Sequence, residues 1–303
     1  MCEVFGKDTP DGLTGESLEA SALPGLVSRN GAGVGLDELI GRHGERLVGR
    51  HNPFPLLLKL LDARDRLSVQ VHPDDKYAAA CEGGKRGKTE AWVVIAAKPG
   101  AKLIYGLSSL GVAGLREALT SPNAAERVPE CLNNVAVKPG DVFYIPAGTV
   151  HAVGAGMLLY EIQQSSDLTY RLWDWERVDE RGMPRELHIK KALDVIEDRA
   201  GVAPIGPVKG VTLPYGQGSR TVYISNEYFT LERLSVSGSV HHEPDGGTFA
   251  LLTALDAGEM RWQGGLLAFK AGDTVFVPAC FDGFDIIGNC DILKSYLTEF
   301  TGG

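Results

Sequence analysis

The sequence predicts a mainly β protein made of two small β-barrels, with a few helices between and beside them. Short apolar runs rich in Val, Ile, Leu and Phe alternate with turn-forming residues drawn from 38 glycines and 16 prolines. This pattern is typical of closely spaced antiparallel strands. One segment occurs twice along the chain, and helical spacing of apolar residues is confined mainly to two places.

The repeated segment divides the chain into two halves. Val137–Gly148 (VKPGDVFYIPAG) is echoed 132 residues later by Phe269–Cys280 (FKAGDTVFVPAC). In both copies a Gly-Asp turn precedes alternating apolar residues and a proline, as in a strand that enters a tight corner of a barrel. The segment resembles a hallmark of cupin barrels, so its two copies indicate a pair of cupin-type, jelly-roll barrels. A weaker match sets Ala91–Gly100 beside Phe249–Gly258.

Apolar residues spaced three and four apart predict helices over residues 110–125 and 186–198. The second helix separates the two β-rich halves, and the Gly- and Pro-rich stretch 201–218 predicts a connector that follows it. The expected domains are an N-terminal barrel with a helical insertion (residues 1–185), a connecting helix (186–200) and a C-terminal barrel (201–303).

Charge and cysteine content exclude several classes of function. The 39 acidic and 30 basic residues give a net charge of −9, which repels nucleic acid and anionic membrane surfaces. Five scattered cysteines without a C-x-x-C spacing indicate neither a disulfide framework nor a thiolate zinc site. No long apolar run or signal-peptide pattern occurs, so we expect a cytoplasmic protein with no membrane or nucleic-acid partner.

Polar side chains of the first half lie on strand-like segments. Ser68, Gln70 and His72 alternate with valines, so they share one face of a strand. Lys88 and Glu90 pair by the same rule. If the apolar faces pack into the barrel wall, these polar faces meet in the barrel mouth.

A histidine beside a proline is more often a surface or hydrogen-bonded residue than a ligand, so the repeat serves as an internal control. With the 132-residue offset His151 corresponds to Gly283, and the weaker match sets Glu90 beside Thr248. A residue required by the barrel itself would occur in both halves, whereas a single metal site needs its ligands once. We therefore expect His72, Glu90 and His151 to bind one metal ion in the first barrel only.

Two histidines and one carboxylate, without a thiolate, suit a zinc ion that keeps positions open for water or substrate. Iron and manganese also fit this ligand set. Gln70 is a further candidate ligand, although an amide oxygen is a poor zinc ligand and equally suits a hydrogen bond to a bound water. The expected cofactor is one zinc ion per chain.

Four motifs resemble signatures of the type I mannose-6-phosphate isomerases, especially their shorter bacterial form. They are Phe54–Asp75, Gly87–Trp92, Tyr144–Ala152 and Glu161–Asp174. The resemblance spans about residues 15–177 and continues more loosely through the second half. It departs from the family at the start, where an additional strand with a Trp-Gly-Gly segment is absent and Leu18 replaces a tryptophan. We expect the missing strand to leave an unpaired edge or an exposed patch near the first barrel.

The resemblance implies interconversion of mannose 6-phosphate and fructose 6-phosphate, with zinc held by Gln70, His72, Glu90 and His151. It also implies roles for residues of the sugar-phosphate pocket: Arg171 as the family's essential arginine, with Lys59, Ser68, Lys88 and Asp167.

Aldose–ketose isomerisation moves a proton between C1 and C2 through a cis-enediol, so the site must hold a phosphate, polarise an oxygen and present a base. We expect zinc to orient the sugar oxygens, Arg171 to add a positive charge, and Lys59, Ser68 and Lys88 to position the anionic end. A ligating histidine does not easily serve as a base. The candidates for the base are His72, Lys88, Asp167 and a metal-bound water.

Other interpretations stay open at this point. Arg171 equally fits a surface ion pair with Asp167 or Asp174. The protein could bind a sugar phosphate without turning it over, although the complete ligand set and Arg171 argue against this. Either a monomer or a homodimer is compatible with the sequence.

A bicupin dioxygenase is the third functional class. Such sites usually contain a His-x-His pair, whereas this chain has Gln70-x-His72. His241 and His242 offer a paired site in the second barrel, but without matching partners they are better interpreted as exposed polar residues.

Overall fold

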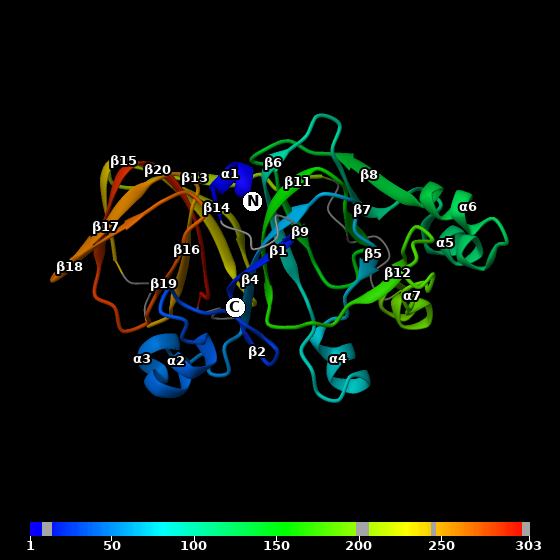
Figure 1. Ribbon diagram of the computed structural model, residues 1–303, viewed down its shortest axis with the longest axis horizontal. Coiled ribbons are helices and arrows are strands. Elements are labelled where there is room, and N and C mark those ends of the chain that lie inside the picture. The colour runs from blue at the N-terminus through cyan, green and yellow to red at the C-terminus, as the bar shows by residue number, and fades with distance from the viewer. Residues whose placement is uncertain (8–13, 198–205, 244–246, 299–303) are drawn as a thin grey trace. The chain divides into compact units, whose positions relative to one another are not determined.

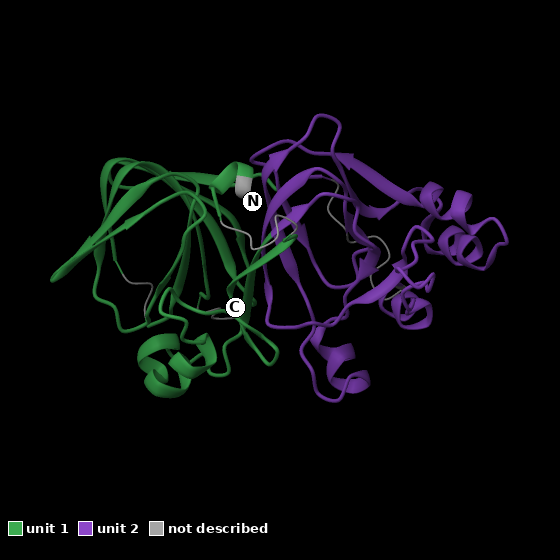
Figure 2. Ribbon diagram, in the orientation of Figure 1, with its two compact units in different colours: residues 1–60, 208–303 green, residues 61–207 purple. Residues whose placement is uncertain are grey.

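The computed structural model describes residues 1–7, 14–197, 206–243 and 247–298 (Figure 1). The chain divides into two compact units, one made of residues 1–60 and 208–303 and the other of residues 61–207 (Figure 2). The first boundary falls inside strand β4 (Leu56–Ala63). The domain limits predicted after residues 185 and 200 differ from this division of the structure and stay a prediction.

The first unit is built on an eight-stranded sheet. Six strands follow the order β13-β14-β15-β20-β16-β19, and β17 lies beside β20 and β18. Its apolar core includes Leu234, Leu252 and Ile292. The strands are β13 (Val211–Pro214), β14 (Gly218–Ser225), β15 (Thr230–His242), β16 (Ala250–Ala254), β17 (Gly258–Trp262), β18 (Gly265–Phe269), β19 (Thr274–Val277) and β20 (Phe284–Tyr296).

The N-terminal part of this unit contributes short elements. Leu18 lies in the middle of β1, which neighbours β4 and ends the strand order among the described strands. The elements are α1 (Cys2–Phe5), β1 (Glu16–Ala20), β2 (Ala22–Leu23), β3 (Leu26–Val27), α2 (Leu36–His43) and α3 (Glu45–Val48).

The second unit contains two packed sheets. One has the order β11-β6-β9, and the other the order β12-β5-β10-β7-β8. Buried residues of both sheets, including Trp92, Leu103, Phe143 and Leu159, form one core, the two-layer packing of a jelly roll. The strands are β5 (Val69–Val71), β6 (Glu90–Ala97), β7 (Lys102–Leu107), β8 (Leu132–Ala136), β9 (Val142–Ile145), β10 (His151–Val153), β11 (Met157–Gln164) and β12 (Tyr170–Trp173). The expectation of a mainly β fold is confirmed.

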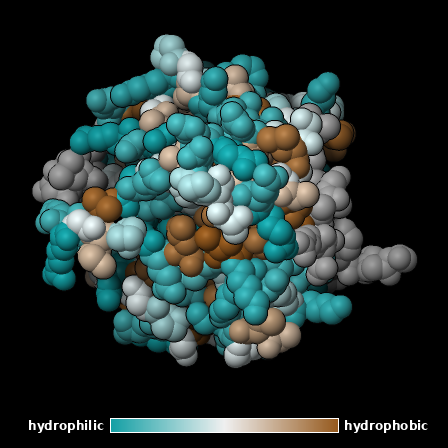
Figure 3. Space-filling model, turned by 90° about the vertical axis from the view of Figure 1, so that its right-hand side faces the viewer, coloured by the Kyte–Doolittle hydropathy of each residue, from teal (hydrophilic) through white to brown (hydrophobic). Residues whose placement is uncertain are grey.

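Three helices cover the outer face of the second sheet of this unit (Figure 1). They are α5 (Gly111–Thr120), α6 (Ala124–Glu130) and α7 (Ile189–Glu197), while α4 (Asp75–Cys81) follows β5. Val69 and Val71 of β5 pack in one cluster with Leu115 of α5 and Ile196 of α7. Because side chains alternate along a strand, Gln70 points to the opposite face, toward the first sheet. The surface at this end of the unit is mostly hydrophilic, with a small hydrophobic patch near its centre (Figure 3).

The expected helices differ from the observed ones at their ends. The helix predicted over 110–125 is interrupted at Ser121, whose backbone is extended (ψ 144°) because the residue before Pro122 avoids helical geometry. The helix predicted over 186–198 begins only at Ile189, since His188 first pairs with Arg171 of β12 through its backbone N–H (2.7 Å). Asp198 and residues 201–205 of the expected connector lie outside the described residues. None of the described helices has the length and apolarity needed to cross a membrane.

The internal repeat folds as the same turn in both copies. The Lys138 amide donates a hydrogen bond to Asp141 Oδ2 (3.0 Å), and the Lys270 amide donates one to Asp273 Oδ2 (2.9 Å). The glycine before each aspartate has a positive φ, which is accessible to glycine without steric cost. The two strand entries predicted from the repeat are therefore equivalent in structure.

The weaker alignment between the halves was wrong by two residues. Beside the N-terminal copy of the repeat, Glu90 pairs with Ile145 across β6 and β9; beside the C-terminal copy, Ala250 pairs with Val277 across β16 and β19. Ile145 and Val277 are related by the 132-residue offset, so Glu90 corresponds to Ala250 rather than to Thr248. The carboxylate is thus replaced by a methyl group.

Candidate metal centre and active site

Three buried side chains converge inside the second unit. His72 follows β5, Glu90 begins β6, and His151 begins β10. One ligand atom from each lies within 4.8 Å of the other two. Among the described residues, no second group of three His, Cys, Asp or Glu side chains meets in this way.

Strand pairing fixes this convergence. His151 lies opposite Gln70 across β10 and β5, so the second sheet carries both histidines near one another; their ring centroids are 4.8 Å apart. Glu90 belongs to the first sheet, between Ile145 of β9 and Gln163 of β11. The carboxylate therefore approaches the imidazoles from the facing sheet.

Backbone carbonyls set the tautomer of each histidine. His72 Nδ1 lies 2.8 Å from the Leu168 carbonyl oxygen, and His151 Nδ1 lies 2.9 Å from that of Thr149. A carbonyl only accepts, so this hydrogen-bond network assigns the ring proton to Nδ1 and leaves the Nε2 lone pairs facing the cluster. Burial, followed by the Lys88 ammonium, lowers the pKa of His72 to about 3, and burial lowers the pKa of His151. Both imidazoles are therefore neutral near pH 7.

Glu90 brings a negative charge to these lone pairs. Burial opposes its ionisation, yet the Lys88 ammonium holds its pKa well below the usual range. Its Oε1 lies 3.3 Å from His151 Nε2, and its Oε2 lies 3.5 Å from His72 Nε2. Within the described residues neither oxygen accepts a hydrogen bond of regular geometry, although Lys88 Nζ lies at an ion-pair distance of 2.7 Å. Glu90 Oε1 and His151 Nε2 face each other as two acceptors without a proton between them, which fits a bound cation.

Lys88 and Glu161 extend the cluster. Lys88 Nζ lies 3.2 Å from His72 Nε2 and 3.8 Å from Glu161 Oε1. Glu161 Oε2 accepts a hydrogen bond from Trp92 Nε1 (3.1 Å), its partner across β11 and β6. Sequence reasoning missed Glu161 as a site residue. The available signal was a carboxylate in the otherwise apolar run 157–162, which needs a buried partner.

Gln70 lies in the middle of β5, and its amide faces His151. The Gln70 amide lies 3.3 Å from His151 Nε2, with nitrogen assigned as the nearer atom. Turning the amide over would direct its oxygen to the cluster instead, because the two ends of a glutamine amide have the same shape. Ser68 is buried directly before β5.

Comparison with known proteins assigns the family. Residues 21–91 match the family model described as phosphomannose isomerase type I, catalytic domain, and residues 219–297 match that of the mannose-6-phosphate isomerase cupin domain. A mannose-6-phosphate isomerase of Streptococcus mutans is 40% identical over 306 residues, covering 97% of this chain and 92% of that protein. Mannose-6-phosphate isomerase ManA of Bacillus subtilis is 39% identical with the same coverage. The chain belongs to the type I mannose-6-phosphate isomerase family.

Solved structures of mannose-6-phosphate isomerases agree with this fold. The crystal structure of the Bacillus subtilis enzyme is 34% identical, with a TM-score of 0.85 over 97% of this chain and 93% of that one. A single-residue mutant of the Salmonella typhimurium enzyme is 17% identical with a TM-score of 0.78, a likeness in fold alone. The mainly β, cupin-type jelly-roll fold expected from the sequence is therefore confirmed.

Arg171, which the resemblance predicts to be the essential arginine, lies opposite Gln70 across β12 and β5. Its Nη1 donates to the Glu186 carbonyl (2.8 Å), while its buried Nε has no hydrogen-bond partner among the described residues. The ion pair considered for Arg171 is not formed, since both carboxylates bind other cations: Asp174 pairs with Arg177 and Arg185, and Asp167 with Lys85.

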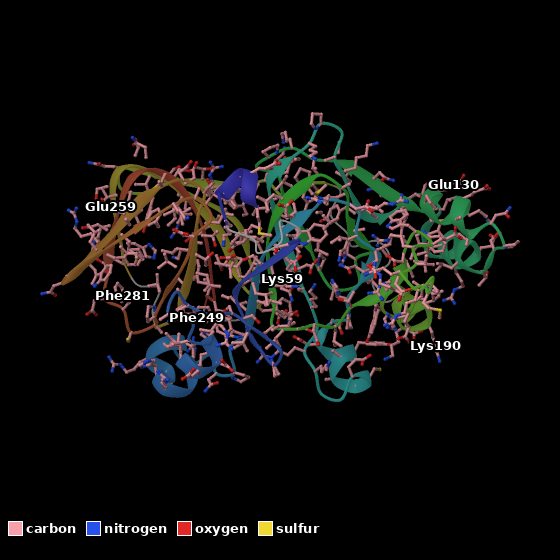
Figure 4. The ribbon with its side chains drawn as sticks, in the orientation of Figure 1. Lys59, Glu130, Lys190, Phe249, Glu259 and Phe281 are labelled. Atoms are coloured by element: carbon pink, nitrogen blue, oxygen red, sulfur yellow. The ribbon has the colours of Figure 1, made fainter. Side chains whose placement is uncertain are left out.

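Two further residues expected in the sugar-phosphate pocket form ion pairs with other side chains. Asp167 is exposed, and its carboxylate lies 3.3 Å from the exposed Lys85 ammonium. Lys59 belongs to the part of β4 in the first unit, where its ammonium pairs with Glu16 at 2.5 Å (Figure 4). Their roles toward substrate stay predictions.

Proposed function

We propose that this chain is a zinc-dependent aldose–ketose isomerase that interconverts mannose 6-phosphate and fructose 6-phosphate through a cis-enediol. Membership of the family supports the reaction, and one structural observation supports the binding of a metal ion. Buried His72, Glu90 and His151 each bring a ligand atom within 4.8 Å of the others, and the Glu90 carboxylate oxygens lie 3.5 Å from His72 Nε2 and 3.3 Å from His151 Nε2. A sugar phosphate is the small-molecule partner that this reaction requires.

The proposed ligands are His72, Glu90 and His151, with Gln70 as a fourth. Nitrogen and oxygen donors without sulfur suit zinc, and the neutral imidazoles need lose no proton to bind it. The carbonyl partners of Nδ1 orient both rings, as is usual around metal-binding histidines. When bound, a zinc ion would polarise the oxygen atoms of the sugar as a Lewis acid.

The chain's own residues would move the proton. In the forward direction a base takes the proton from C2 of the open-chain aldose while the C1 carbonyl oxygen gains one. The base then delivers its proton to C1 while the C2 hydroxyl gives up its own proton and becomes a carbonyl; one proton is gained at O1 and one is lost at O2, so the reaction is balanced without another reactant. Glu161 joins Lys88 and Asp167 as a candidate base, because it is buried and lies 3.8 Å from Lys88 Nζ. His72 is a poor candidate, since its only lone pair faces the cluster.

Positive charge would bind the developing anion and the phosphate. We propose that Arg171, half-buried beside Gln70 on the neighbouring strand, stabilises the enediolate charge. Lys59, Ser68 and Lys88 would anchor or position the anionic end of the substrate. We also propose that the protein is cytoplasmic and acts as a monomer or a homodimer.

A coupled assay on mannose 6-phosphate tests this proposal. Protein stripped with a chelator is expected to lose turnover and to regain it with one equivalent of zinc, with metal content measured by mass spectrometry. Full turnover after complete metal removal would contradict the metal-dependent mechanism. Binding of hexose phosphates without turnover on any of them would favour a sugar-phosphate sensor instead.

A further inference from the structure

Lys88 lies among the proposed metal ligands rather than beside them. Its Nζ is 2.7 Å from Glu90 Oε2 and 3.2 Å from His72 Nε2. Its side chain is 8% exposed, and its backbone N–H is fixed by a hydrogen bond to the Pro73 carbonyl (2.9 Å). The ammonium is therefore held in direct contact with two of the three ligand residues.

A metal ion bound by the same residues would be very close to this ammonium. Zinc lies about 2.0–2.2 Å from nitrogen and oxygen ligands, and His72 Nε2 and Glu90 Oε2 are 3.5 Å apart. Given the distances of Lys88 Nζ to these two atoms, any ion bound to both lies within about 4 Å of Nζ. Two cations this close repel each other strongly in a buried site.

The same ammonium also has a stabilising role. Glu90 is 0% exposed and Glu161 is 4% exposed, and Lys88 is the cation that contacts both carboxylates. A buried carboxylate that loses its counter-ion destabilises a fold strongly. Removing the ammonium therefore has two effects. It removes the repulsion toward a bound metal ion, and it leaves the negative charge of Glu90 without its counter-ion in metal-stripped protein.

We propose that the Lys88 ammonium competes with the metal ion for Glu90: it neutralises this carboxylate in metal-stripped protein and weakens the affinity of the site for zinc. The proposal rests on the proposed function, because it takes the cluster of His72, Glu90 and His151 as the zinc site. It adds that the affinity of this site is set by a fixed internal cation as well as by its ligands.

The substitution Lys88→Met tests this, since it removes the charge and keeps an unbranched side chain. The zinc Kd, measured by competition with a chromophoric chelator, is expected to fall at least about tenfold. The melting temperature of the stripped variant is expected to fall below that of the stripped wild type, and zinc is expected to raise it by more. Lys85→Met is the matched control, because Lys85 is exposed and pairs with an exposed carboxylate; it should change neither quantity.

A second variant keeps the test valid if Lys88→Met does not fold without metal. Lys88→Met/Glu90→Gln removes both charges, so the stripped double variant is expected to regain stability. An unchanged or higher zinc Kd in Lys88→Met would overturn the proposal, as would a double variant that is no more stable than the single one. Failure of the wild type to bind zinc would instead contradict the proposed function itself.

Discussion

His151 faces Gln70 across the β10–β5 ladder, and the Gln70 amide lies 3.3 Å from the imidazole nitrogen whose lone pair points into the cluster. The contact allows the amide either to ligate a metal through its oxygen or to orient His151 through its nitrogen. Neither role is as strong as that of an imidazole or carboxylate ligand.

Gln70→Leu is therefore expected to weaken zinc binding by about 10- to 100-fold, the range found when an outer partner of a metal ligand is removed. His151→Asn, which removes a direct ligand, is expected to weaken it much further. Both affinities can be measured with the same chelator competition. Equal losses of zinc affinity in the two variants would show that Gln70 contributes as much as a direct ligand. No loss of affinity in Gln70→Leu would exclude both roles.

The stability of metal-stripped protein is expected to fall as the pH decreases below about 6.5. The pKa of His72 is lowered from 6.5 to about 3, so between these values the unfolded chain binds a proton that the native chain does not. Unfolding is therefore favoured as the pH falls through this window, by up to about 1.4 kcal/mol per pH unit for each such histidine. The lowered pKa values of His151 and Glu90 act in the same direction.

Denaturant unfolding at several pH values checks this dependence. Because His72→Asn removes one titrating group, the slope of unfolding free energy against pH should become smaller between pH 4.5 and 6.5. The comparison uses slopes, so it holds even if the variant is less stable overall. A slope identical to that of the wild type would show that His72 has the same pKa in the folded and unfolded states.

Arg171→Ala is expected to lower kcat by at least about a hundredfold while zinc content stays at one ion per chain. Arg171 has a buried Nε without a partner among the described residues, and neither Asp167 nor Asp174 pairs with it. Its charge is therefore available to an anionic group. Arg181→Ala, at an exposed arginine, is the control, and turnover near the wild-type value in Arg171→Ala would refute the proposed role.

Glu161→Gln is expected to reduce kcat about 10²- to 10⁴-fold, the usual contribution of a general acid or base. The amide keeps the acceptor for Trp92 Nε1 and the shape of the side chain, so the fold and zinc content should not change. A pH–rate profile separates the two possible roles. If Glu161 is the base, the pH–rate profile of Glu161→Gln should lack one limb. If Glu161 only positions Lys88, the variant should be slower at every pH while the profile keeps its shape.

The alternation of polar and apolar residues predicted which face of the β5 segment points toward the candidate metal site. Val69 and Val71 pack against helices while Gln70 faces inward, as expected from period-two spacing. Glu161 could not be found in this way, because every residue of β11 is buried and a carboxylate inside such a run shows its partner only in three dimensions.

The alignment of the two halves failed for a local reason. Gly100 lies in the turn after β6, whereas Gly258 is the first residue of β17. Matching these two glycines shifts the preceding strands by two residues relative to their true pairing. Backbone pairing, which sets Ala250 at the place of Glu90, depends on hydrogen bonds that a glycine match does not report.

A buried ion pair in the first unit was equally invisible in the sequence. Glu232 and Lys294 lie opposite each other across β15 and β20, and both are 0% exposed. Lys294 Nζ is 3.2 Å from Glu232 Oε1 and 4.0 Å from the centre of the Tyr296 ring. Arg220 Nε approaches the other carboxylate oxygen at 3.4 Å.

Removing one partner of this pair leaves a buried charge, so Glu232→Leu is expected to destabilise the protein by about 3–5 kcal/mol. Lys294→Met should cost less, because Arg220 still faces the carboxylate. The double variant Glu232→Leu/Lys294→Met replaces the pair with apolar side chains, and such replacements are often neutral or stabilising. We therefore expect the double variant to be more stable than Glu232→Leu alone, as measured by denaturant unfolding. Additive losses in the double variant would show that the two charges do not depend on each other, despite their 3.2 Å separation.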